Sequence, residues 1–179
     1  MKILAISGSL RLKSTNTTLL RALALVSPRG VEVSLYEGLG ALPMFNPDIE
    51  ATDPLAVAKF REQIANADAI VIASPEYAHG VTGVLKNALD WMVGSEAFVN
   101  KPVAIFNASS RALHAKASLK ETLAMMSAYV VDNAATEIDL IGSPIGEEEI
   151  VADPQKSAVL RDAIAKLCVA VASERSQLK

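Results

Sequence analysis

Two kinds of hydrophobic pattern alternate along this chain. Short apolar runs predict β-strands at residues 2–7, 31–36, 69–73, 103–106 and 136–141. Between and after these runs, apolar residues three and four positions apart predict helices. The apolar stripes of these helices are Leu19, Leu23 and Val26; Val57, Phe60 and Ile64; Leu85, Leu89 and Met92; Leu119, Leu123 and Met126; and Leu160, Ile164, Leu167, Cys168 and Val171. Asp53 and Pro54 are expected to be the N-cap and the first residue of the second helix. Strands that alternate with helices indicate an α/β fold with a parallel sheet.

The strand patterns also predict the order of the strands in the sheet. The runs at 2–7, 69–73 and 103–106 are continuously apolar, as expected for strands that are covered by helices on both faces. The runs at 31–36 and 136–141 alternate apolar with polar residues, which favours the sheet edges. With right-handed crossovers, these positions predict a five-stranded parallel sheet in the order 2-1-3-4-5, which is the flavodoxin-like three-layer sandwich.

In this order the chain changes its winding direction between the first and third strands. Ligands of such sheets bind at the carboxyl ends of the strands, at the point where the direction changes. Three loops should meet there, at residues 8–15, 74–82 and 107–114. We therefore expect the chemistry of the protein in these loops.

The first loop, GSLRLKSTN at residues 8–16, looks like a P-loop at first sight. Lys13 stands where a P-loop needs its second glycine, and the glycines of a Rossmann fingerprint are missing too. What remains is a polar turn with hydroxyl, amide and cationic groups before a helix N-terminus, which attracts anions. The turn suits a phosphomonoester. In the alternative interpretation, Ser14 or Thr15 only caps the helix and Arg11 is a solvated charge.

The second loop, SPEYAHGVT at residues 74–82, follows a strand that is predicted to be buried. Pro75 stiffens the turn, and Tyr77 would stand beside any flat ring held above the strand ends. Alternatively, Tyr77 is a half-buried packing aromatic. His79 is interpreted as an ordinary exposed histidine, and Thr82 is expected to cap the following helix.

The third loop, NASSRALHA at residues 107–115, also lies between a strand and a helix. Ser109 and Ser110 either bond a ligand or cap this helix, and His114 falls in its first turn. No catalytic role is assigned to either histidine, because the sequence places no carboxylate or cysteine beside them. Trp91, the only tryptophan, lies off the apolar stripe of its helix, so that a core position and an oligomer contact are both open.

Composition narrows the class of protein. A chain of 179 residues with 51% hydrophobic residues predicts a single globular domain, residues 1–179. A net charge of −3 without a Lys/Arg block argues against nucleic acid as a partner. No apolar run approaches the roughly 18 residues that span a bilayer, and residues 1–7 are strand-like, so we expect a cytoplasmic protein with no membrane partner. Cys168 is expected in the core, and two histidines with one cysteine give no metal-ligand spacing.

Three ordered segments together resemble the NADPH-dependent FMN reductase family, which includes bacterial quinone, chromate and azo-dye reductases. The segments are Gly8-Ser9-Leu10-Arg11 with Ser14 and Asn16; SPEY at 74–77 with the nearby GVLKNALDW at 83–91; and LPMFNPD at 42–48. The resemblance covers nearly the whole chain, and the three motifs together are more specific than any one of them.

The resemblance implies which residues contact FMN. It implies that the phosphate is held by Ser9, Arg11, Ser14, Thr15 and Asn16, and that the isoalloxazine ring is lined by Pro75, Glu76, Tyr77 and Ala78. The third loop adds Ala108 and Ser109 to the expected cofactor contacts. This chain departs from the family pattern at two places. The family usually has Asn where Ala78 stands, and a glycine-rich turn where this chain has residues 108–112.

The resemblance also implies an activity. An FMN-dependent NAD(P)H oxidoreductase passes hydride from NAD(P)H to quinones or similar small electron acceptors, here by a ping-pong mechanism. Because FMN supplies the hydride chemistry, no acid/base dyad needs to be visible in the sequence. The family forms dimers and tetramers, so a homodimer or homotetramer is expected.

Two other functions remain open. A flavodoxin-like electron carrier is usually strongly acidic and covers its flavin with aromatic residues, which fits poorly with a charge of −3 and 4% aromatic residues. A flavin-free interaction module would agree with the altered third loop.

Overall fold

The computed structural model describes residues 1–140 and 145–177, in which the strands form one parallel sheet. The strands are β1 (Lys2–Ser7), β2 (Glu32–Tyr36), β3 (Ala69–Ala73), β4 (Pro102–Asn107), β5 (Tyr129–Val130) and β6 (Thr136–Glu137). The sheet order is β2-β1-β3-β4-β5, with β6 also paired to β4. The predicted order and the flavodoxin-like fold are therefore confirmed, with β2 at one edge.

The opposite edge corrects the predicted fifth strand at residues 136–141. Two short strands share the outer side of β4, because the 3-10 turn η3 (Asp132–Ala134) interrupts the pairing between them. β5 pairs with the start of β4 and was missed, whereas β6 pairs with its end. Beyond β6, the Ile138 and Leu140 N–H groups still donate to β4 and the loop after it, at 3.0 and 3.1 Å. Residue 141 of the predicted strand lies outside the described residues.

Helices follow the strands as the apolar stripes predicted. The α-helices are α1 (Thr15–Val26), α2 (Pro47–Glu50), α3 (Leu55–Asn66), α4 (Gly83–Asp90), α5 (Leu113–Met125), α6 (Glu147–Ala152) and α7 (Pro154–Gln177), and the other 3-10 turns are η1 (Leu39–Ala41) and η2 (Glu96–Phe98). All five predicted helices are present, whereas α2 and α6 span only 4 and 6 residues and are too short to show a repeating stripe.

The predicted start of α3 was wrong by one residue. Pro54, in extended conformation, is the N-cap, and the helix begins at Leu55. Asp53 has a positive φ of 44° and does not cap the helix; its carboxylate instead pairs with Arg61 at 3.0 Å.

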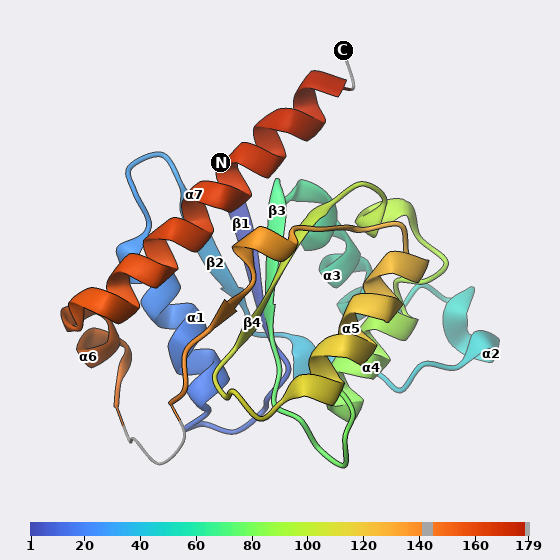
Figure 1. The fold of residues 1–179 in the computed structure, drawn as a ribbon. Helices are drawn as coiled ribbons and strands as arrows, with labels where there is room; N and C mark the ends of the chain where they lie inside the picture. The colour runs from blue at the N-terminus through green and yellow to red at the C-terminus, as the bar shows by residue number, and fades with distance from the viewer. Residues whose placement is uncertain (141–144, 178–179) are drawn as a thin grey trace.

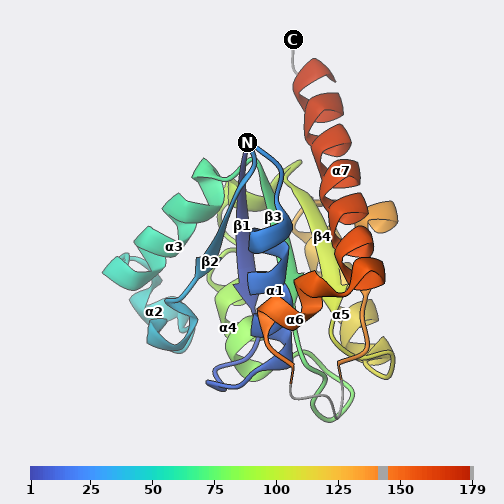
Figure 2. The ribbon, with the colours of Figure 1, turned by 90° about the vertical axis from the view of Figure 1, so that its left-hand side faces the viewer.

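Helices cover both faces of the sheet (Figures 1 and 2). α1, α6 and α7 lie on one face, and α3, α4 and α5 lie on the other. Alternate residues of β1 point to the two faces of the sheet. Ile3 and Ala5 pack in the core under α1, α6 and α7, and Leu4 and Ile6 pack in the core under α3, α4 and α5. Cys168 is partly buried against the first layer, where desolvation raises the pKa of its thiol, so its expected packing role is confirmed. No helix in the described ranges is long and apolar enough to cross a membrane.

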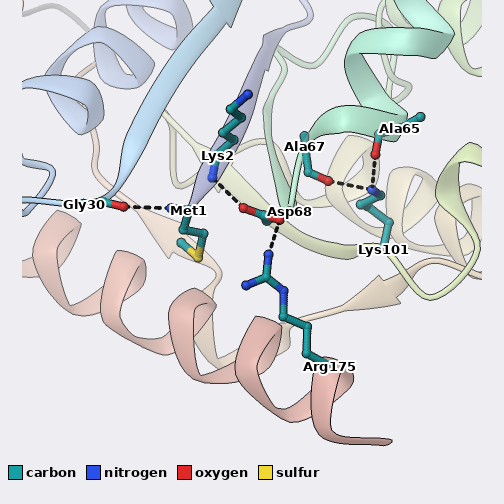
Figure 3. Close-up of polar contacts among 8 residues, drawn as sticks. All are labelled: Met1, Lys2, Gly30, Ala65, Ala67, Asp68, Lys101 and Arg175. Atoms are coloured by element: carbon teal, nitrogen blue, oxygen red, sulfur yellow. Dashed lines mark hydrogen bonds and ion pairs between the residues drawn. The ribbon is translucent and has the colours of Figure 1, made fainter. Parts of the chain in front are cut away.

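A polar network holds the amino end of the sheet together (Figure 3). The Asp68 carboxylate accepts a hydrogen bond of 2.7 Å from the Lys2 N–H and forms an ion pair with Arg175 near the end of α7. The Lys101 ammonium donates to two carbonyl oxygens at the C-terminus of α3, at 3.2 and 2.6 Å. Burial lowers the pKa of Lys101, although the charge of Asp68 opposes the shift. These contacts stabilise the end of the fold opposite the three loops.

Candidate functional site

The loops that follow β1, β3 and β4 meet at the carboxyl end of the sheet, as the strand order predicted (Figure 1). The Gly8 N–H donates to the carbonyl oxygen of Ala73 at 2.8 Å, and the Thr82 hydroxyl donates to the carbonyl oxygen of Gly8 at 2.6 Å. A Cβ at Gly8 would lie 2.4 Å from the Ser74 Oγ, so this close approach requires glycine. Thr82 also caps α4 by accepting from the Leu85 N–H, as expected.

The first loop ends at a helix N-terminus with free donors. Ser14 is buried and caps α1, because its Oγ accepts from the Thr17 N–H at 3.3 Å. Thr15 is the first residue of the helix and not its cap. The N–H groups of Thr15 and Asn16 have no acceptor in the part of the chain that the structure describes. Two donors are thus available at the positive end of the helix dipole, where anions bind.

Asn16 is buried without a complete set of partners. Its side chain is 5% exposed, and its Oδ1 atom accepts no hydrogen bond from residues 1–140 or 145–177. A buried polar atom without a partner costs about 1–3 kcal/mol, so its retention points to a ligand. Asn16 lines a pocket of about 300 Å³, here called the α1 pocket. The walls of the α1 pocket are Thr15, Asn16, Pro75, Glu76, Asn107, Ala108, Ser109, Arg111 and Ala112.

Glu76 joins the second loop to the helix after the third. Its carboxylate accepts a hydrogen bond of 2.8 Å from the Ala115 N–H, in the first turn of α5. Ala112 is the N-cap of α5, and its side chain offers no capping bond. Glu76 therefore caps α5 from a distant segment and fixes the spacing of two walls of the α1 pocket.

The third loop is a turn held by its own side chains. Asn107 Oδ1 accepts from the Ser109 N–H at 3.1 Å, and Ser109 Oγ accepts from the Arg111 N–H at 3.1 Å. The Ser110 hydroxyl donates to the Asp139 carboxylate at 3.1 Å. Ser109 and Ser110 thus shape or anchor the loop, and neither caps α5, which excludes one of the two roles left open for them.

The tip of the second loop is a strained two-residue hairpin. Tyr77 and Gly80 exchange backbone hydrogen bonds of 3.1 and 3.0 Å, and the two residues between them, Ala78 and His79, have φ angles of 49° and 60°. His79 is exposed, as predicted, but its ring also stacks on that of His114 at a centroid distance of 4.2 Å. The stack is a second contact between the second loop and α5.

A larger, mainly apolar pocket is lined by the start of the first loop. It has a volume of about 580 Å³ and is called the apolar pocket here. Its apolar walls are Leu10, Leu39, Leu42, Met44, Tyr77 and Val84, and its polar walls include Ser9, Arg11, Thr82 and Asn87. The side-chain amide of Asn87 is hydrogen-bonded within the protein, because it accepts from the Phe45 N–H and donates to the Pro43 carbonyl oxygen.

Trp91 belongs to the core and helps to build the apolar pocket. Its ring is 2% exposed and meets Phe45 edge-on at a centroid distance of 5.1 Å. The indole N–H donates to the Pro43 carbonyl oxygen at 2.7 Å. Trp91 and Asn87 together fasten residues 42–45 to α4. Of the two positions left open for Trp91, the core position is the one observed.

The predicted cofactor residues divide between the two pockets. Thr15, Asn16, Pro75, Glu76, Ala108 and Ser109 line the α1 pocket; Ser9, Arg11 and Tyr77 line the apolar pocket; Ser14 is a buried cap, and Ala78 is exposed in the hairpin. Sequence reasoning missed Arg111 in the wall of the α1 pocket. The signal was present, because Arg111 is a cation in a loop that follows a buried strand.

Comparison with known proteins gives a consistent result. A family model described as NADPH-dependent FMN reductase matches residues 1–140. An NAD(P)H-dependent FMN reductase of Pseudomonas aeruginosa is 38% identical over 135 residues, which cover 72% of this chain and 72% of that protein. A quinone reductase of Escherichia coli is 29% identical over 167 residues, 89% of this chain and 85% of the relative. Among solved structures, the flavoenzyme NAD(P)H:(acceptor) oxidoreductase FerB of Paracoccus denitrificans superposes with a TM-score of 0.68 at 26% identity, covering 98% of this chain and 97% of FerB.

Proposed function

This chain belongs to the NADPH-dependent FMN reductase family, and on that premise we propose that it transfers hydride from NAD(P)H to quinones or similar small acceptors. It is an oxidoreductase that uses FMN, with NAD(P)H as co-substrate. FMN, when bound, supplies the centre that receives and delivers hydride. The task of the protein is then to bind, orient and shield this cofactor.

The main support for a cofactor site is the buried Asn16 Oδ1 atom, which has no hydrogen-bond partner among the described residues. It lies beside free N–H groups at the N-terminus of α1. FMN combines a phosphate with a hydroxylated ribityl chain. The Thr15 and Asn16 N–H groups suit the phosphate, and a ribityl hydroxyl would give Asn16 Oδ1 its missing donor. The α1 pocket thus suits the polar half of FMN. Ser14 caps the helix at this point, and Ser9 and Arg11, which line the apolar pocket, are proposed to reach the phosphate from the first loop.

The second and third loops suit the ring half of FMN. Pro75, Glu76, Tyr77 and Ala78 form a rigid segment, because Glu76 is bound to α5 and the hairpin closes on itself. Backbone groups of this segment can bond the polar edge of a ring without a charged side chain. Ala108 and Ser109 line the α1 pocket together with Pro75, Glu76 and Asn107. We propose that these residues orient the isoalloxazine ring.

NAD(P)H and the electron acceptor are proposed to occupy the open side of the ring in turn, which is the order of a ping-pong reaction. The apolar pocket suits an acceptor with a large apolar surface, since most of its walls are apolar and its Asn87 and Thr82 side chains are already hydrogen-bonded. Its volume of about 580 Å³ lies within the range of small-molecule sites. The exposed Tyr77 at its rim is 57% accessible and adds an aromatic face.

The wider setting also remains a proposal. We infer a single domain that works in the cytoplasm as a homodimer or homotetramer, without nucleic acid or a membrane. Exposed apolar side chains near the first loop support an oligomer, since Leu12 is 98% and Met44 is 77% exposed.

Initial-rate kinetics of the purified holoprotein test the proposed reaction. Oxidation of NADPH is measured against a quinone at several fixed concentrations of each substrate. Parallel double-reciprocal lines are expected for a ping-pong reaction. Intersecting lines would contradict the proposed order, and the absence of NADPH and NADH oxidation with any quinone would contradict the proposed activity.

A further inference from the structure

Arg111 stands in the wall of the α1 pocket without an ionic partner. Of the residues that line this pocket, Arg111 is the one cation, whereas Arg11 of the first loop lines the apolar pocket. The Arg111 guanidinium makes no hydrogen bond or ion pair with any described residue. The phosphate role that the sequence assigns to Arg11 therefore has a second candidate in the lining of the α1 pocket.

The position of Arg111 is fixed through its backbone. Its N–H donates to Ser109 Oγ, and Ser109 is in turn held by Asn107, a residue that is 3% exposed. The Asn107 amide also donates to the Ala112 carbonyl oxygen at 3.2 Å, so the turn is closed on both sides of Arg111. The backbone of Arg111 is thus anchored at the pocket wall, and its side chain is exposed.

The nearby negative charge does not neutralise Arg111. Glu76 shares the α1 pocket, but its carboxylate is bound to the Ala115 N–H, and no ion pair joins it to Arg111 among the described residues. Some other cations, such as Arg61 and Lys86, are paired with carboxylates at 3.0 and 2.5 Å, but Arg21 is exposed without a described partner, so what distinguishes Arg111 is its place in the pocket wall. The α1 pocket thus offers a cation on one wall and the free N–H groups of α1 on another.

We propose that Arg111 binds the phosphate of FMN in the α1 pocket, which it lines together with Thr15 and Asn16. This assignment rests on the proposed FMN site. A guanidinium binds two phosphate oxygens through parallel N–H donors, a geometry that one ammonium group does not provide. The phosphate is then held between the Thr15 and Asn16 N–H groups and Arg111, with Asn16 Oδ1 left for a ribityl hydroxyl.

Binding of FMN and of riboflavin tests the assignment, because riboflavin lacks only the phosphate. Flavin fluorescence is titrated with apoprotein of the wild type, Arg111→Ala and Arg111→Lys. Arg111→Ala should raise the dissociation constant for FMN about tenfold or more, as expected for a lost charge-assisted hydrogen bond, and change that for riboflavin less than about twofold. Arg111→Lys should recover part of the lost FMN affinity, because it keeps the charge.

A matched control is Arg21→Ala, which removes an exposed cation of α1 that has no described partner and lies outside both pockets. It should leave both dissociation constants unchanged. Equal weakening of FMN and riboflavin by Arg111→Ala would overturn the assignment, since Arg111 would then contact the ring. Unchanged FMN affinity, or a higher KM for NADPH alone, would also overturn it. If wild-type apoprotein fails to bind FMN, the proposed cofactor site itself fails, which is a distinct outcome.

Discussion

The Glu76 carboxylate accepts a hydrogen bond of 2.8 Å from the Ala115 N–H and so caps a helix that begins 37 residues later in the chain, at Leu113. The contact places a negative charge at the positive end of the α5 dipole. It also ties the loop after β3 to the helix after β4, and these segments form two walls of the α1 pocket. Glu76 therefore has a structural role in the site, which does not depend on a contact with a ligand.

Removal of this cap should destabilise the protein. Glu76→Ala is expected to lower the free energy of unfolding by about 1 kcal/mol, the usual effect of losing a capping bond and a favourable dipole interaction. Urea denaturation of the apoprotein measures the change. Glu121→Ala, at an exposed position of α5 with no described partner, is the control and should stay within about 0.5 kcal/mol of the wild type. Equal effects of the two variants would show that the capping bond contributes nothing.

Asn16 and Asn87 should respond in opposite ways to the same substitution. Asn16→Leu removes a buried oxygen that has no partner in the described protein, so the stability of the apoprotein should stay the same or rise. Asn87→Leu takes the acceptor from the Phe45 N–H and should cost about 1–3 kcal/mol. Thermal unfolding without flavin measures both.

FMN binding gives a second test of Asn16→Leu. Asn16→Leu should weaken FMN binding about tenfold, the equivalent of one good hydrogen bond, even though it does not destabilise the apoprotein. Stability as low as that of Asn87→Leu would show that Asn16 serves the fold and not a ligand.

The hairpin at residues 77–80 stores backbone strain that glycine should relieve. Ala78 has a φ of 49°, and the left-handed region costs an ordinary residue about 1–2 kcal/mol. Ala78→Gly should therefore raise the free energy of unfolding by about 0.5–1 kcal/mol after the entropy of glycine is subtracted. Ala24→Gly, on the exposed side of α1, is the same change in a helix and should lower it by a similar amount. Differential scanning calorimetry compares the variants, and a loss of stability in Ala78→Gly would refute the strain.

Asp68 should give the protein a stabilising contribution that acid removes. Burial alone would raise the pKa of Asp68, but the Lys2 N–H bond and the charge of Arg175 together hold this pKa below its ordinary value. Because the folded pKa is the lower one, the contribution is complete above the unfolded pKa of about 4 and is lost as the pH falls through the folded pKa.

Asp68→Asn tests this dependence. The variant should be about 1 kcal/mol less stable than the wild type at pH 7, a modest effect because Arg175 is 62% exposed, and the difference should shrink below about pH 4. Urea denaturation across this pH range measures the difference. Asp132→Asn, which removes a pair with Lys120 at the surface, is the control and should show little pH dependence. A stability difference for Asp68→Asn that persists at low pH would contradict the pKa shift.

The sequence predicted those parts of the fold that have a clear pattern of apolar and polar residues along the chain. β1, β3 and β4 are buried on both faces, so that their apolar runs fix their positions, and the alternating pattern of β2 placed it at an edge. β5 has only two residues and left no such signal. The predicted cap at Asp53 was wrong because this residue adopts a positive φ and pairs with Arg61, which a local motif does not encode.

The sequence predicted which loops form the candidate site, but it did not predict the contacts between their residues. Strand order brought the three loops together. Thr82 was predicted as a cap, and Ser14 was one of the two caps named in the alternative interpretation of the first loop. The Glu76 bond to Ala115 and the stack of His79 on His114 join residues more than 30 positions apart, so only the three-dimensional fold reveals them. Arg111 is different, because its charge and its place in a loop after a buried strand were visible in the sequence, and only its place in the pocket wall required the structure.

FMN binding by the purified protein tests the central claim most directly. Flavin fluorescence and visible absorption are followed while apoprotein is added to a fixed amount of FMN, with Asn16→Leu as the site-specific comparison. We expect saturable quenching at one FMN per chain, with a dissociation constant about tenfold higher for Asn16→Leu. A flavin spectrum and fluorescence that stay unchanged with excess wild-type protein would contradict the assignment of the α1 pocket as an FMN site.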